Sequence, residues 1–205
     1  VLVEKPTTTP STLTALDART GETKWTAATT HPFRMFKVDG GLRIRGYDDW
    51  VAYCAELDLL LTGKAGSVSA LEAQTGNPVW QAKLSGLPIM LRGKTFLNQS
   101  GILFDTATGQ PLRTDPLIKG SGGCNYAVAS EHLILLRHHT AAYIEIATGR
   151  MEHLLNIRSG CSNSLIAADG LLNAPNFSVG CVCNYPLQTF YAMSPMPEVA
   201  DWSRP

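Results

Sequence analysis

A repeated motif constrains the fold of this chain more than any other feature. Residues 15–25 read ALDARTGETKW, and residues 70–80 read ALEAQTGNPVW. Both fit the pattern Ala-x-Asp/Glu-x-x-Thr-Gly-x-x-x-Trp, which chance rarely produces twice in one short chain. The alternation of apolar and polar residues before the Thr-Gly break indicates a half-buried strand, a tight turn and a second strand that carries the tryptophan. The sequence therefore predicts a repeated β-hairpin.

Two looser copies of the motif follow, at residues 103–113 and 143–153, and each keeps the acidic residue and Thr-Gly but lacks the final tryptophan. Short apolar runs lie between the motifs, separated by Gly, Pro, Asn or Asp, as is typical of antiparallel strands. Repeats of about 40 residues with four short strands each are the signature of β-propeller blades. We therefore predict an all-β chain of four-stranded antiparallel blades, with about four to five blades present and the ring incomplete.

One segment is longer than a blade of this kind requires. We predict an inserted loop or hairpin at about residues 29–56, centred on 39–50, within a single propeller portion that covers residues 1–205. The stretch YDDW at residues 47–50 combines paired carboxylates with aromatic rings, a composition that suits a sugar or a cation. We favour a solvated loop, because inserted loops are more often passive than functional.

The charge balance excludes two classes of partner. The chain has 17 basic and 17 acidic residues among 205, and its lysines and arginines are scattered. Such a chain lacks the electrostatic surface that binds nucleic acid or an anionic membrane. It also lacks a run of about 18 apolar residues, so we predict no membrane span.

Cysteine usage favours an oxidising compartment. Of five cysteines, four lie in the last 82 residues: Cys124, Cys161, Cys181 and Cys183. We favour disulfides among these four, with free buried thiols or a metal site as alternatives. The Cys-x-Cys spacing near the end lacks the two-residue spacer of zinc knuckles, so we predict no metal site.

The histidines offer a further candidate site. His138 and His139 are neighbours on a predicted strand, where adjacent side chains face opposite sides, so they do not easily bind one metal. One of them could line a channel as a base or a metal ligand, with His132 or His153 near by. We favour solvated histidines or histidines satisfied by hydrogen bonds.

The two full copies of the motif resemble the tryptophan-docking motif of quinoprotein-like β-propellers. This superfamily includes pyrroloquinoline quinone (PQQ) dehydrogenases and outer-membrane assembly lipoproteins that bind no cofactor. The resemblance implies that each tryptophan packs against the backbone of the adjoining blade, where the indole N–H finds a partner. The structural docking residues that it implies are Ala15, Asp17, Gly21, Trp25, Ala70, Glu72, Gly76 and Trp80.

The resemblance also implies that blades are missing. Propellers of this superfamily have about seven or eight blades, so we expect the C-terminal part of a longer propeller, or one piece of an assembly. The expected partners are the remaining blades or another protein chain; two copies of this chain closing one ring is a further possibility. Large PQQ dehydrogenases use an adjacent-cysteine disulfide and calcium, and this sequence has no Cys-Cys pair. We therefore predict no cofactor, with PQQ and calcium as the alternative.

The expected function is a non-catalytic scaffold or a module that binds a protein or a ligand. The expected location is extracytoplasmic, either periplasmic or secreted, in a bacterial-type cell. The alternative is a portion of a PQQ- or haem-dependent oxidoreductase whose active site lies largely in absent sequence. Whether the chain is an enzyme therefore stays open, and no catalytic or cofactor-binding residue is assigned.

Overall fold

The computed structural model describes most of the chain. It covers residues 12–28, 50–63, 66–85, 87–120, 125–160, 163–176 and 189–195 in full, and the backbone alone of residues 2–5, 36–38, 41–43 and 64. The four predicted disulfide cysteines Cys124, Cys161, Cys181 and Cys183 lie outside the described residues, as do residues 47–49 of the YDDW stretch. The chain divides into two compact units, residues 1–115 and 116–205, which are described separately.

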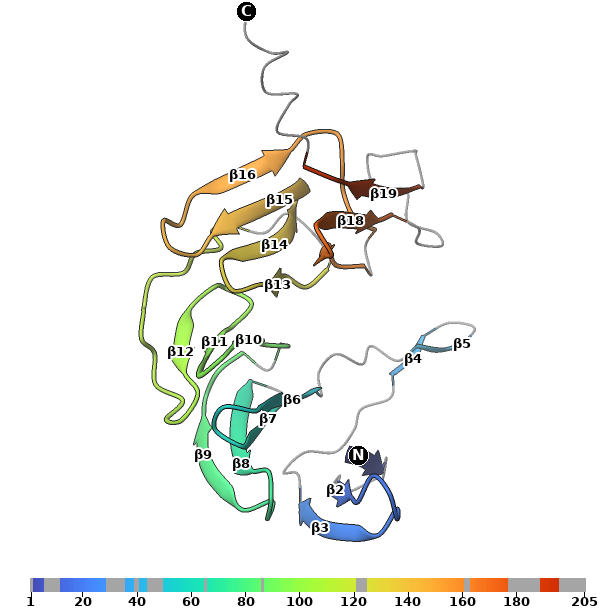
Figure 1. Cartoon of the computed structure of the whole chain (residues 1–205), viewed down its shortest axis with the longest axis vertical. Helices are drawn as coiled ribbons and strands as arrows, with labels where there is room; N and C mark the ends of the chain where they lie inside the picture. Colours follow the sequence, from blue (N-terminus) through green and yellow to red (C-terminus); the bar gives the residue numbers. More distant parts are fainter. Residues whose placement is uncertain are drawn as a thin grey trace, which may run out of the picture. The chain divides into compact units, whose positions relative to one another are not determined.

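The first unit contains three antiparallel sheets and a hairpin (Figure 1). The first sheet has three strands: β1 (Leu2–Lys5), β2 (Thr12–Leu16) and β3 (Thr23–Ala28). The second has four: β6 (Trp50–Cys54), β7 (Leu59–Lys64), β8 (Ser67–Glu72) and β9 (Pro78–Ala82). The third has three: β10 (Met90–Arg92), β11 (Thr95–Leu97) and β12 (Leu103–Asp105), and a bridge from Phe104 to Pro111 extends it.

The predicted insertion contains regular structure. Strands β4 (Phe36–Val38) and β5 (Gly41–Arg43) pair as an antiparallel hairpin within it. Its last part, from Trp50 to Cys54, is strand β6 and pairs with β7. Residues 50–54 therefore form the edge strand of the second sheet.

The second unit contains two antiparallel sheets. The first has four strands: β13 (Val128–Ala129), β14 (Leu133–His138), β15 (Thr140–Glu145) and β16 (Met151–Leu154). The second has three: β17 (Ile166–Ala168), β18 (Leu171–Pro175) and β19 (Phe190–Met193).

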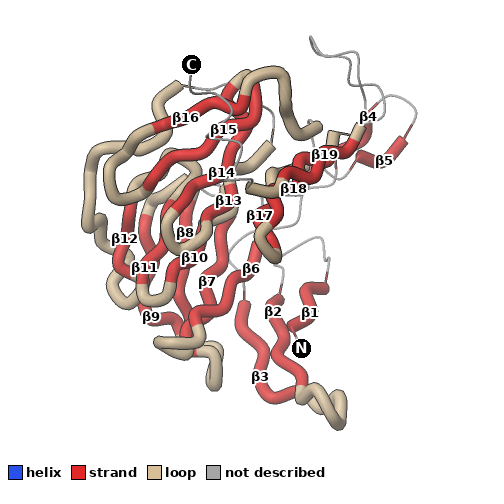
Figure 2. Tube along the Cα trace, turned by 45° about the horizontal axis from the view of Figure 1, so that its top comes forward, coloured by secondary structure: helices blue, strands red, loops and turns tan. Residues whose placement is uncertain are grey.

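Strands follow one another in sequence order within every one of these sheets. Apart from strands, the described residues form only turns, bends and loops (Figure 2), so none of them forms a helix that could cross a membrane. The structure confirms the predicted all-β class and the partial β-propeller. In the described part of the chain, five sheets of three or four strands agree with the expected four to five blades.

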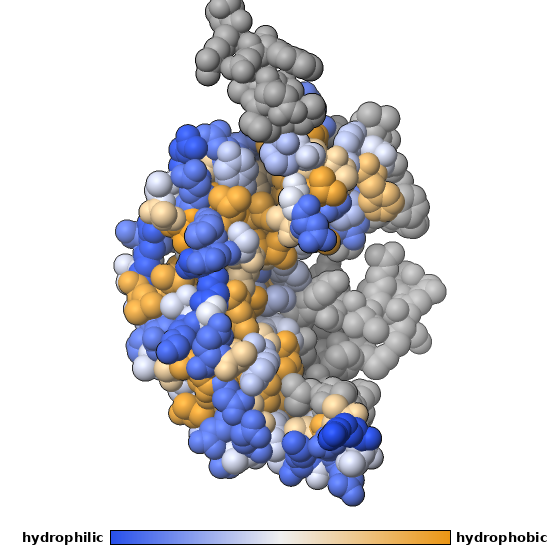
Figure 3. Space-filling view, viewed as in Figure 1, coloured by the Kyte–Doolittle hydropathy of each residue, from blue (hydrophilic) through white to orange (hydrophobic). Residues whose placement is uncertain are grey.

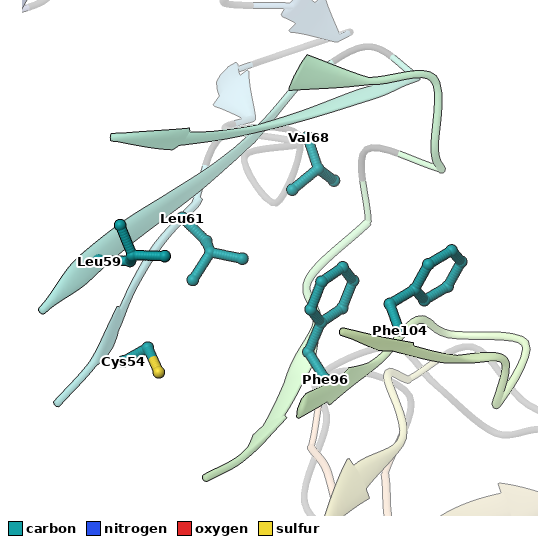
Figure 4. Close-up of a cluster of buried hydrophobic side chains, with 6 residues drawn as sticks. All are labelled: Cys54, Leu59, Leu61, Val68, Phe96 and Phe104. Carbon is teal, nitrogen blue, oxygen red and sulfur yellow. The ribbon is translucent and has the colours of Figure 1, made fainter. Parts of the chain in front are cut away.

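Each unit has its own hydrophobic core. In the first unit, side chains from the second and third sheets meet (Figure 4): Cys54, Leu59, Leu61, Val68, Phe96 and Phe104. The rings of Phe96 and Phe104 stack with centroids 5.0 Å apart, and the Trp80 ring stacks on Phe96 with centroids 6.3 Å apart. The core of the second unit is built around Leu135, Ala141, Leu165 and Ala174.

Candidate functional site

The Thr-Gly turn of the first motif is held by its own acidic side chain. The Asp17 carboxylate accepts hydrogen bonds from the N–H groups of Arg19 at 2.9 Å and Thr20 at 3.1 Å. The Gly21 N–H donates to the Asp17 carbonyl at 2.9 Å, and Gly21 has a φ of 75°. Glycine adopts this left-handed conformation without the steric cost of a Cβ atom, so the motif encodes the turn locally.

The same turn recurs at each of the other three copies. The Thr75 hydroxyl donates to Glu72 at 2.6 Å, and the Thr108 and Thr148 hydroxyls donate to their own acidic residues at 2.8 Å. In each copy the glycine N–H donates to the carbonyl of the acidic residue. The two copies that lack the tryptophan therefore keep the turn, because the turn depends only on the acid, the threonine and the glycine.

In two of these turns, hydrogen bonds lower the pKa of the acidic side chain. Backbone N–H groups of Arg19 and Thr20 lower the pKa of Asp17, and the Thr148 hydroxyl together with the Arg150 guanidinium lowers the pKa of Glu145. In both cases donors stabilise the charged form. These carboxylates are therefore anions that order turns, and their lowered pKa makes them poor general acids.

Trp25 of strand β3 contacts the second sheet. Its indole N–H donates to the Ala73 carbonyl at 3.0 Å, in the turn between β8 and β9. The indole also lies over Gly76, where a Cβ atom would stand only 2.6 Å from Trp25 Cε3. Gly76 is thus required twice, by its φ of 75° and by the tryptophan above it.

Trp80 of strand β9 repeats this contact on the third sheet. Its indole N–H donates to the Thr106 carbonyl at 2.9 Å, and a Cβ atom at Gly109 would stand 2.6 Å from Trp80 Cε3. The motif alanines lie opposite the tryptophans in the strand pairing, Ala15 opposite Trp25 and Ala70 opposite Trp80. Both alanines are buried, so each contributes a small side chain beside a large ring.

Two structural residues were missed by sequence reasoning. The third copy of the motif has no tryptophan to cover the glycine of the fourth copy, Gly149. Leu117 covers it instead, since a Cβ atom at Gly149 would lie 3.3 Å from the Leu117 side chain. Trp50, the last residue of YDDW, lies opposite Gly63 in the β6–β7 pairing, and a Cβ atom at Gly63 would collide with its indole. No motif marks either position. Trp50 therefore packs against its own sheet and the first core cluster.

Of the two histidines that the sequence suggested as neighbours, His132 and His153, the structure places His153 beside His138. His138 Nδ1 lies 3.0 Å from His153 Nε2, and His138 Nε2 lies 3.2 Å from the Lys119 carbonyl oxygen. His139 does not follow the strand alternation expected for it, because it sits at the turn between β14 and β15 with a φ of 64°, and its ring contacts that of His138 edge-on. His132 is exposed, and its Nε2 lies 3.9 Å from Glu131 Oε2.

The described residues contain neither a metal site of three or more ligands nor a reactive thiol. Within them, no three or more His, Cys, Asp or Glu side chains form a group that could hold a metal ion. Cys54 is a free, buried thiol whose Sγ donates to the Gly93 carbonyl at 3.3 Å. Burial raises the pKa of Cys54, so the thiol stays protonated and belongs to the core.

The last sheet presents an exposed apolar face. By the strand pairing, Ile166, Leu171 and Phe190 lie on one face, and their side chains are 52%, 40% and 68% exposed. The opposite face packs into the core of the second unit through Leu172, Ala174, Tyr191 and Met193. Figure 3 shows hydrophobic residues at the surface over β18 and β19. Both faces of this sheet are therefore apolar, and one of them is open.

Comparison with known proteins identifies the family. The model of the family described as outer membrane protein assembly factor BamB matches residues 9–112, just over half of the chain. The chain belongs to this family. The match includes both full copies of the tryptophan motif, which confirms the resemblance to PQQ-like β-propellers.

Solved structures support the same fold. BamB from Moraxella catarrhalis is 19% identical with a TM-score of 0.52, over 84% of this chain and 53% of that one. The computationally designed Ika8 protein is 11% identical with a TM-score of 0.52, over 83% of this chain and 54% of that one. The matched part of this chain thus spans about half the length of these proteins. No curated protein sequence matches the chain significantly.

Proposed function

We propose that this chain is a non-catalytic, protein-binding propeller module that acts outside the cytoplasm in the assembly of outer membrane proteins. The observation that carries the proposal is the family match across residues 9–112 to an outer membrane protein assembly factor. A scaffold of this kind requires rigid sheets and an open surface for its partner, but no reactive group.

The contacts of the motif support a scaffold. Trp25 and Trp80 each direct the indole N–H to a backbone carbonyl of the next sheet and cover a glycine there. Rings used in this way are not free to stack on a quinone or a substrate. The acidic residues of the motif are likewise engaged in turns, and those with a lowered pKa are poor proton donors.

The exposed face of β17–β19 is the surface that this proposal assigns to protein contact. It carries the exposed apolar side chains of Ile166, Leu171 and Phe190 on one face, and exposed apolar patches mark interaction sites when they are contiguous. We assign to it another propeller sheet, either of the same propeller or of a partner chain. The opposite face of β17–β19 already packs against a sheet of the same type, the one formed by β13–β16.

Site-specific photo-crosslinking in the source cells tests this proposal. A photoreactive phenylalanine at position 190 is expected to crosslink to a protein, and mass spectrometry then identifies the partner and the crosslinked residue. The matched control places the same group at Lys24, which is exposed on the first sheet and is expected to give no crosslink. Loss of the gene is expected to lower the amount of outer membrane proteins.

The alternative function predicts a different result. An oxidoreductase portion would reduce a dye when PQQ and calcium are added to the purified protein. Such activity would overturn the non-catalytic part of the proposal. Equal crosslinking from positions 190 and 24 would overturn the assigned surface.

A further inference from the structure

We propose that His138 and His153 form a binding site for a divalent transition metal, with Cu²⁺ and Ni²⁺ as the ions that best fit the geometry. His138 ends strand β14 and His153 lies on strand β16, on either side of β15. The proposal is independent of the scaffold function and uses only described residues of the second unit. With two protein ligands, water molecules complete the coordination.

The first argument concerns the hydrogen on His138. A backbone carbonyl only accepts hydrogen bonds, so the contact of His138 Nε2 with the Lys119 oxygen at 3.2 Å places a hydrogen on Nε2. In the neutral ring, Nδ1 therefore presents its lone pair. A carbonyl that binds the second ring nitrogen is the usual surrounding of a histidine that ligates a metal, since it fixes the tautomer and the orientation of the ring.

The second argument concerns the distance between the two nitrogens. His138 Nδ1 and His153 Nε2 lie 3.0 Å apart. With metal–nitrogen bonds of about 2.0–2.1 Å, two nitrogens at this separation subtend an angle of about 95° at the metal. That is close to the right angle of the tetragonal geometry that Cu²⁺ and Ni²⁺ prefer. A tetrahedral Zn²⁺ ion would require the rings to move apart.

The third argument concerns access and adjustment. His153 is exposed and His138 is half-buried, so an ion reaches the pair from solvent. Their rings are tilted by 52° with centroids 5.3 Å apart. In the metal-free pair His138 Nδ1 accepts the hydrogen that His153 Nε2 carries. When an ion binds, this hydrogen moves through solvent to His153 Nδ1, so that His153 stays neutral and its Nε2 gains a lone pair. Rotation about the bond to an imidazole ring is soft, so both nitrogens can then turn to a common ion.

Calorimetric titration of the tag-free chain with Cu²⁺ and with Ni²⁺ tests the site. We expect one ion per chain, and His138→Gln and His153→Gln are each expected to weaken binding by at least about tenfold, since each removes one of the two nitrogen ligands. The control is His132→Gln, because His132 is exposed and contacts Glu131 instead of the pair. It is expected to leave the affinity unchanged.

A fourth variant separates the pair from its neighbour. His139→Asn keeps the left-handed backbone, since asparagine tolerates a positive φ, and it is expected to bind the ion as wild type does. Circular dichroism at rising temperature shows that each variant is folded. Absence of binding by the folded wild type, or an equal loss in His132→Gln, would overturn the proposal.

Discussion

At the scale of single residues, the motif turns show two separate reasons for glycine, the backbone conformation and the contact with a tryptophan ring. Gly21 and Gly76 occupy equivalent turns and share a φ of 75°. A Cβ atom at Gly21 would meet nothing within 4 Å, whereas at Gly76 it would meet the Trp25 indole at 2.6 Å. The first glycine is therefore required by conformation alone, and the second by conformation and by packing.

This difference predicts unequal costs for the same substitution. Gly21→Ala is expected to lower the free energy of unfolding by about 1 kcal/mol, the cost of a left-handed alanine. Gly76→Ala adds overpacking against the indole and is expected to cost about 3 kcal/mol in total. Urea unfolding monitored by tryptophan fluorescence measures both. Equal losses would show that Trp25 does not rest on Gly76.

The indole N–H groups allow a second test at this scale. Trp25→Phe keeps an aromatic ring but leaves the Ala73 carbonyl without its donor, and it is expected to cost about 1–2 kcal/mol. Trp80→Phe removes the donor to the Thr106 carbonyl and is expected to cost a similar amount. Urea unfolding checks this: each variant is expected to lower the midpoint concentration without changing the dependence of the unfolding free energy on urea concentration. An unchanged midpoint for both would refute a stabilising role of the two hydrogen bonds.

At the scale of elements, the Thr-Gly turn is a unit that forms from its own side chains. The acid accepts hydrogen bonds from residues two or three positions later, and the glycine closes the turn onto its carbonyl. Because these contacts are local, the four copies adopt the same turn although only two carry a tryptophan.

The lowered pKa of Asp17 predicts a pH dependence of stability. In the folded chain the carboxylate keeps its charge to lower pH than in the unfolded chain, so over this window the unfolded state binds more protons. The contribution is fully present above the ordinary aspartate pKa and is lost as the pH falls through the folded pKa. Asp17→Asn keeps an acceptor oxygen but removes the titration.

Unfolding measurements on both proteins, from about pH 5 to about pH 2, are the check. The wild type is expected to lose stability relative to Asp17→Asn as the pH falls. A constant difference between them across this range would contradict the prediction. A direct titration of the Asp17 carboxyl by NMR gives the same sign independently.

At the scale of the whole molecule, the chain belongs to a propeller family, and its match covers 53% of the length of BamB from Moraxella catarrhalis. Within the second unit, the sheet β17–β19 is buried on one face and open on the other. The identity of the strand neighbours follows from sequence order, whereas the burial of a face depends on what packs against it.

The open face predicts an effect on association without an effect on folding. Phe190→Ser removes a 68% exposed ring and is expected to reduce association through this face, while changing the free energy of unfolding by less than about 0.5 kcal/mol. Tyr191→Ala, on the buried face, is expected to destabilise by about 3 kcal/mol. Light scattering and urea unfolding measure the two effects. A strongly destabilised Phe190→Ser variant would mean that the face is covered within the chain.

The sequence by itself determined the all-β class, the repeated turns and the approximate number of sheets. These features depend on strand alternation and on hydrogen bonds between residues a few positions apart, so a local pattern contains them. Strand β6 was hidden because it lies at the end of a long segment without a motif. The docking role of the tryptophans came from family resemblance and not from the pattern itself.

Only the tertiary structure decided which residues meet across long separations. It placed Trp25 on the turn at Gly76, Leu117 over Gly149 and His153 beside His138. It also showed which face of β17–β19 is open. Such contacts depend on the register and packing of paired strands, and a one-residue shift in register would exchange the two faces of a strand. The turn is thus determined by the local sequence, whereas the side chain that packs on its glycine is determined by the tertiary fold.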